Sequence, residues 1–279
     1  VENRYYYKKQ EAGKTVRAFT EPLHELSGFE EMTKEAQKTG LITISGCIDA
    51  QKSHMIYGIS NGRKNKVIVT FHEQKAKELY DDYRFFEPNT VYYPAKDILF
   101  YQSDIRGNLL TAERIRALRA IHEQQEVTVI TTFDALMNTM APPKTLWDSI
   151  RRIESGDTVV LDELVARLVQ MGYEKEYQVD TVGQFALRGG ILDVYPLTED
   201  NPVRIEMWGD EVDTIRSFDV ESQKSIENLE ELVIYPACEL VLDDEEKQAG
   251  IARFLKEAKT FASKLKKEMK TEEAHRALS

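Results

Sequence analysis

The segment from Gly46 to Ser53 (GCIDAQKS) has the residue types that could bind a nucleotide phosphate. A phosphate-binding loop reads G-x-x-x-x-G-K-[ST], in which backbone amides and the lysine hold phosphates and the hydroxyl binds magnesium. Here Lys52 stands at the expected spacing, but Gln51 replaces the second glycine and Asp49 adds a negative charge. Both changes oppose anion binding. We therefore predict a degenerate loop that only connects a strand to a helix, with weak nucleotide binding as the alternative.

A second segment, residues 159–163 (VVLDE), resembles the acidic strand that accompanies a phosphate loop. It lies beyond Pro142-Pro143, a natural domain boundary, and so falls in a different domain from Lys52. We predict instead that Asp162 is the N-cap of a helix. The five histidines are scattered without metal-ligand spacing. We expect no catalytic residue, no metal and no cofactor.

The elements before the prolines alternate between strands and helices. Apolar runs predict strands at 41–44, 67–69, 90–93 and 127–130. Helices are predicted from a capping box at 27–30 to about 40, from about 52, at 73–83, at 111–122, and after 130 with Thr131 or Thr132 as its cap. This rhythm predicts a parallel sheet covered on both faces.

Beyond the prolines the pattern becomes antiparallel. A helix is predicted at 162–171, followed by short strands at 185–187, 191–195, 203–208, 212–218 and 232–235. Within 203–208 apolar residues alternate with Arg204, Glu206 and Trp208, which indicates one buried face and one wet face. Acidic residues at 243–246 then open a last helix, whose apolar stripe needs a covering surface.

Composition limits the classes of function. The 279-residue chain has a net charge of −11, so it has no overall attraction for phosphate backbones. Its two cysteines are far apart, which fits a reducing cytosol rather than a disulfide framework. No apolar run is long enough to span a bilayer. Because it starts at Val1, we expect a piece of a longer protein.

The most specific text is GYEK at 172–175, GQFALRGGILDVYP at 183–196 and PVRIEMWGDEVDTIR at 202–216, with YPA at 235–237. It closely resembles the UvrB-like N-terminal module of bacterial transcription-repair coupling factors. The resemblance runs from about residue 40 to 240 and is strongest from 172 to 237. UvrB itself has stretches similar to the second and third, but its phosphate loop is intact. Residues 98–101 and 112–118 also favour the coupling factors.

The resemblance implies an α/β architecture in which a degenerate P-loop NTPase-like domain is interrupted by an inserted α+β antiparallel domain. We expect the first domain at 1–143, a domain similar to UvrB domain 2 at 144–240, and a helix returning to the first domain at 241–279. In the family the inserted domain binds UvrA. RNA polymerase, double-stranded DNA and ATP are bound by later domains, and the C-terminal part covers the UvrA site.

The resemblance also assigns binding residues. The basic positions of UvrB-like domains map onto Lys175 and Arg188, a third basic position is Ala186 here, and Phe185 could add an apolar anchor. From the residues alone, Lys175 and Arg188 are better interpreted as ordinary solvated surface charges, and it is the resemblance that favours a binding role. Two other functions stay open: a fragment of a UvrB-type ATP-dependent repair helicase, and a structural domain that only uses the P-loop fold as a scaffold.

Overall fold

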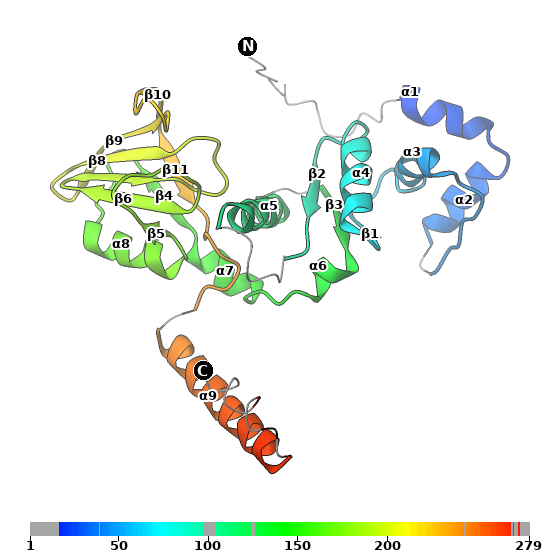
Figure 1. The fold of residues 1–279 in the computed structure, drawn as a ribbon. Helices are drawn as coiled ribbons and strands as arrows, with labels where there is room; N and C mark the ends of the chain where they lie inside the picture. Colours follow the sequence, from blue (N-terminus) through cyan, green and yellow to red (C-terminus); the bar gives the residue numbers. More distant parts are fainter. Residues whose placement is uncertain are drawn as a thin grey trace. The chain divides into compact units, whose positions relative to one another are not determined.

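The computed structural model describes residues 17–38, 40–96, 104–123, 126–242, 244–268, 270 and 273. The chain divides into two compact units, Val1–Asn138 and Thr139–Ser279 (Figure 1). The predicted similarity at 98–101 lies outside the described residues.

Unit 1 is built on a three-stranded parallel sheet in the order β1-β3-β2. Its strands are β1 (Asn65–Thr70), β2 (Thr90–Tyr93) and β3 (Val127–Thr132). Its helices are α1 (Arg17–Thr20), the 3₁₀ helix η1 (Glu21–Glu25), α2 (Phe29–Ala36), α3 (Asp49–Ile59), α4 (Glu73–Tyr83), α5 (Asp104–Glu123) and α6 (Phe133–Met137). The predicted parallel sheet is confirmed, and the hydroxyl of Thr132 caps α6 by accepting from the amide of Ala135 at 3.2 Å.

Two predictions for the start of unit 1 are wrong. Residues 41–44 form no strand, and Leu41 is 95% exposed. The described sheet ends at β1 and β2, and residues 41–44 add no strand to either edge. The capping box is also absent, because Gly28, in the left-handed region at φ 82°, is the N-cap of α2. A glycine has no side chain with which to cap, and α2 ends at Ala36 rather than near Gly40.

Unit 2 is built on a six-stranded sheet in the order β10-β9-β8-β7-β6-β5 and a two-stranded sheet, β11-β4. The six strands are β5 (Glu174–Lys175), β6 (Gln184–Arg188), β7 (Ile191–Val194), β8 (Val203–Trp208), β9 (Glu211–Phe218) and β10 (Ser225–Leu229), with β4 (Arg151–Glu154) and β11 (Glu231–Ile234) in the small sheet. The antiparallel pairing of β6 to β9 is confirmed. The sequence did not predict β4, β5 or β10, and β5 pairs with β6 in parallel.

Helix α8 (Leu161–Gln170) covers one face of the large sheet and α7 (Pro143–Ser149) precedes β4. The core forms where Leu164 and Leu168 of α8 meet inward side chains of the strands, such as Ile205. The N-cap of α8 is Val160, so the prediction of Asp162 as the cap is wrong. Asp162 lies in the first turn instead, where its charge favours the positive end of the helix.

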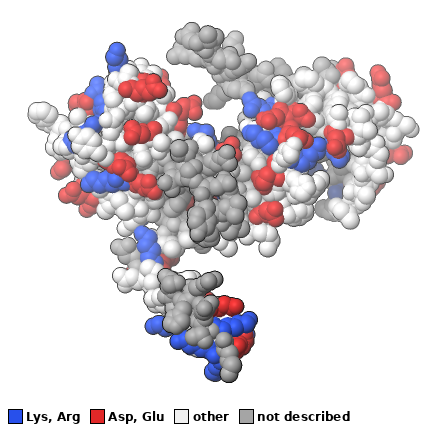
Figure 2. Space-filling model, viewed as in Figure 1, with Lys and Arg blue, Asp and Glu red and all other residues white. Residues whose placement is uncertain are grey.

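Helix α9 (Asp244–Lys267) confirms the predicted last helix. Ile251, Phe254 and Phe261 on its apolar stripe are exposed, whereas Ala262 and Leu265 are buried. Figure 2 shows lysine and arginine side chains gathered along this helix. No helix in the described part of the chain is long and apolar enough to cross a membrane.

Candidate functional site

The large sheet of unit 2 has two unlike faces. Strand side chains alternate, so one face packs against α8 and the other carries mainly polar groups. We call the second face the polar face. By register it comprises Ala186 and Arg188 of β6, Ile191 and Asp193 of β7, Arg204, Glu206 and Trp208 of β8, and Thr214 and Arg216 of β9.

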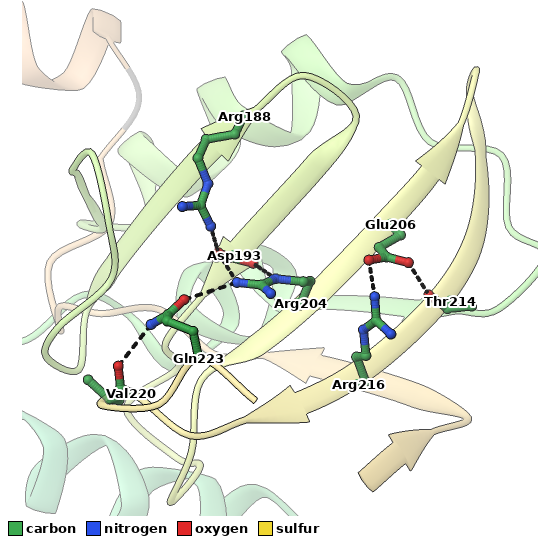
Figure 3. A network of polar contacts seen from close by, with 8 residues as sticks. All are labelled: Arg188, Asp193, Arg204, Glu206, Thr214, Arg216, Val220 and Gln223. Atoms are coloured by element: carbon green, nitrogen blue, oxygen red, sulfur yellow. Dashed lines mark hydrogen bonds and ion pairs between the residues drawn. The ribbon is translucent and has the colours of Figure 1, made fainter. Parts of the chain in front are cut away.

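One carboxylate organises the polar face (Figure 3). The Asp193 side chain is only 1% exposed. Arg204 donates to it with Nε at 2.7 Å and Nη2 at 2.9 Å, and Arg188 donates with Nη2 at 2.6 Å. The hydrogen bonds to Asp193 raise the pKa of the Arg204 guanidinium. Burial removes this carboxylate from water, and its well-aligned hydrogen bonds to two cations compensate the cost of that desolvation.

Arg204 is held from a second side as well. The Gln223 Oε1 atom accepts from Arg204 at 3.1 Å, and the Gln223 side-chain amide donates to the Val220 carbonyl at 2.8 Å. Gln223 has a φ of 57°, an uncommon conformation for a residue with a side chain. The Arg204 guanidinium also lies 4.5 Å from the centre of the Phe218 ring. Several neighbours therefore fix its position.

A second ion pair lies farther across the polar face. Arg216 pairs with Glu206, which also accepts from the Thr214 hydroxyl at 3.1 Å (Figure 3). Arg216 Nε is buried and has no hydrogen-bond partner among the residues that the structure describes. This pair balances its own charge, so it adds little net charge to the surface.

Trp208 is the exposed aromatic residue of the polar face. It ends β8, and its side chain is 83% exposed. The preceding amide, that of Met207, donates to the carbonyl of Gly190 at 2.8 Å, so the β6–β7 turn lies beside the end of β8. A side chain on Gly190 would come within 3.1 Å of the Met207 carbonyl oxygen, which favours glycine there. Arg188, Arg204 and Trp208 thus share one face of the sheet, with Arg204 at the start of β8 and Trp208 at its end.

Comparison with known proteins finds relatives of the segment that contains this sheet. A model described as the UvrB interaction domain matches residues 152–240. The transcription-repair-coupling factor of Bacillus subtilis (strain 168) is 31% identical over 258 residues, which is 91% of this chain and 21% of that protein. Those of Staphylococcus haemolyticus and Staphylococcus aureus (strain Mu50) are 35% and 32% identical over 66% and 77% of this chain. The chain belongs to the transcription-repair-coupling factor family. It spans about a fifth of the length of these relatives.

Within this coupling-factor module, the residues predicted to bind a partner lie apart. Arg188 is on the polar face with its side chain 39% exposed. Lys175 is exposed on the edge strand β5, but it is in register with Phe185, whose row faces the core. Phe185 is completely buried. The prediction of Phe185 as an exposed anchor is therefore wrong, since strand alternation turns its ring toward α8.

The structure adds Asp193, Arg204 and Trp208, which the sequence reasoning did not assign to a site. The signal was present in the alternation of 203–208, because Arg204 and Trp208 were already predicted on the wet face. A tryptophan on a wet face is an informative exception, since large aromatic rings are usually mostly buried. No sequence signal indicated that Asp193 would be buried between two arginines.

In the coupling-factor module, charged side chains of the phosphate-loop-like segment 46–53 pair with neighbouring charged side chains. Asp49 begins α3 and accepts hydrogen bonds from Lys52 at 2.6 Å and from Lys75 at 3.4 Å. The hydrogen bond from Lys52 is the main reason why the pKa of Asp49 is lowered. Ser53 is buried. Asp49 therefore compensates the charge of Lys52, and the degenerate phosphate loop stays a prediction.

The described residues hold no group of three or more histidine, cysteine or acidic side chains suited to a metal ion. His24 and His54 take part in ring contacts instead, with Phe29 and Phe86 respectively.

Proposed function

We propose that this chain is a protein-interaction module that recruits UvrA during transcription-coupled nucleotide excision repair. The observation that carries the proposal is the pair Arg188 and Arg204, which share Asp193 on the same sheet face as the exposed side chain of Trp208. These residues lie within the segment that matches the UvrB interaction domain. Membership in the transcription-repair-coupling factor family supports the same conclusion.

The chemistry of the polar face selects an acidic partner with an apolar pocket. Two guanidinium groups bound to one carboxylate retain a net positive charge, and their planar N–H groups suit carboxylates. Arginine and tryptophan are also the residue types that most often dominate binding energy at protein interfaces. We propose that Arg188, Arg204 and Trp208 form the centre of the interface. Lys175, on the edge strand, contributes from the rim.

The degenerate loop supports a role without catalysis. Lys52 is paired with Asp49, Gln51 replaces a glycine, and Ser53 is buried. We propose that this chain hydrolyses no ATP by itself. The parent protein would bind RNA polymerase and translocate on DNA with ATP through parts beyond this chain, and its C-terminal part would cover the UvrA site. The isolated chain should then bind UvrA constitutively.

A binding assay with purified UvrA tests the proposal. The intact chain should retain UvrA in a pull-down without nucleotide. Arg188→Glu should abolish retention, Lys175→Glu should only weaken it, and Arg152→Glu on the small sheet should leave it unchanged as the matched control. Retention that survives both Lys175→Glu and Arg188→Glu would place the interface elsewhere. No retention by the unmodified chain would reject the function.

The alternative, a UvrB-type ATP-dependent repair helicase fragment, is tested separately. It would require the segment from Gly46 to Ser53 to bind phosphates despite the Asp49–Lys52 pair. Titration with a fluorescent ATP analogue should show no saturable binding in the micromolar range. Saturable binding that Lys52→Ala removes would favour the helicase.

A further inference from the structure

We propose that Asp193 is a positioning residue, which presents Arg188 and Arg204 to the partner as a preformed pair of guanidinium groups. The inference rests on the proposed function and adds a residue that does not itself touch the partner. The Asp193 side chain is 1% exposed, so its carboxylate has almost no surface of its own to offer. Its effect on binding must therefore pass through the two arginines.

Both oxygens of Asp193 are engaged. Oδ1 accepts from Arg204 Nε at 2.7 Å, and Oδ2 accepts from Arg204 Nη2 at 2.9 Å and from Arg188 Nη2 at 2.6 Å (Figure 3). The bidentate contact fixes the plane of the Arg204 guanidinium. The shared Oδ2 atom then fixes the distance from that plane to the end of Arg188. Arginines held in this way lose less conformational entropy when a partner binds.

The location of Asp193 also argues for a role beyond stability. By register it lies between Ala186 of β6 and Arg204 of β8 in the middle of the sheet. A well-packed apolar residue at such a position is often as stabilising as a buried ion pair, because burying charges carries a desolvation cost. A buried carboxylate there has a clear use if the orientation of Arg188, which is 39% exposed, and of Arg204, which is 16% exposed, matters for binding.

The two arginines do not depend equally on Asp193. Arg204 is also held by Gln223 at 3.1 Å and by the Phe218 ring. For Arg188, Asp193 is the one side-chain partner seen among the described residues. Loss of the carboxylate should therefore release Arg188 while Arg204 keeps part of its support. The binding contribution of Arg188 should disappear when Asp193 is changed.

A double-mutant cycle on UvrA affinity tests this dependence with the whole chain. Arg188→Ala alone should weaken binding about 30-fold, as expected for a hot-spot arginine. Asp193→Asn alone should weaken it at least about tenfold, and adding Arg188→Ala to it should cost no more than about threefold further. Wild-type affinity for Asp193→Asn, or a fully multiplicative loss in the double variant, would overturn the inference. Asp180→Asn, an exposed aspartate in the same unit, is the control.

Two further measurements keep the inference separate from folding and from the proposed function. Gln223→Ala, which leaves Asp193 intact, should weaken binding less than Asp193→Asn, and its effect should vanish in an Arg204→Ala background; a multiplicative effect there would contradict the account. Nitrogen-15 relaxation at the Arg188 guanidinium needs no partner. It should show an ordered group in the wild type and a mobile one in Asp193→Asn, and equal mobility would refute the positioning role even if UvrA did not bind.

Discussion

Two aspartates in this chain each lie between two cationic side chains, one aspartate in each unit. Asp49 in unit 1 contacts Lys52 and Lys75 with its side chain 65% exposed. Asp193 in unit 2 contacts Arg188 and Arg204 with its side chain 1% exposed. The residue types are similar, but the exposed trio is screened by water and the buried one is not.

The difference shows how the environment of a carboxylate decides its role. At Asp49 the carboxylate compensates a lysine charge that a phosphate would need, and flexible lysines give little fixed geometry. At Asp193 the planar guanidinium groups fit both oxygens, and burial keeps the arrangement in place. In our proposal Asp49 opposes a phosphate site, whereas Asp193 supports a protein-binding site.

The largest predicted effect compares aromatic residues on the two faces of the same sheet. Phe185→Ala should lower the free energy of unfolding by about 4 kcal/mol, because the ring is completely buried in the core. Trp208→Ala should change it by less than about 0.5 kcal/mol, because that ring is solvated. Urea denaturation measures both. A large loss of stability for Trp208→Ala would show that the exposed ring has a structural role.

The next effect compares the two aspartates directly. Asp193→Asn should lower the free energy of unfolding by about 3 kcal/mol, because it leaves two arginines without their shared charge. Asp49→Asn should leave the urea midpoint unchanged, since exposed ion pairs contribute little. Equal effects of the two substitutions would contradict the view that burial distinguishes the two trios.

The smallest predicted effect concerns the pKa of Asp49. That pKa is lowered mainly by the hydrogen bond from Lys52 and less by the one from Lys75. Lys52→Ala should therefore raise the pKa of Asp49 toward its ordinary value more than Lys75→Ala does. Carboxyl NMR during an acid titration measures both. The opposite order would show that Lys75 has the larger influence on the pKa of Asp49.

Much of the fold could be predicted because local patterns were strong. The helix Glu73–Tyr83 and the strands Thr90–Tyr93 and Val203–Trp208 have the predicted bounds. The apolar run at 41–44 failed because a strand also needs a neighbour, which a local pattern does not reveal. The strand Glu174–Lys175 was missed because two residues carry no periodicity.

The site was predicted in part for similar reasons. Arg188 was found through family resemblance, and the alternation of 203–208 already placed Arg204 and Trp208 on the wet face. In β6 the apolar residues Phe185 and Leu187 also alternate with residues that face the other way. The inward position of Phe185 could therefore have been predicted from the sequence. The burial of Asp193 depends on cross-strand neighbours that only the register reveals.

The central claim is that the polar face of unit 2 binds UvrA, and calorimetric titration of UvrA with the intact chain tests it most directly. The account predicts saturable binding without nucleotide. It also predicts that Arg204→Glu, on the polar face, abolishes this binding, whereas Lys52→Glu in the phosphate-loop-like segment 46–53 leaves the affinity unchanged. Absence of binding, or binding that Arg204→Glu leaves intact, would contradict the account.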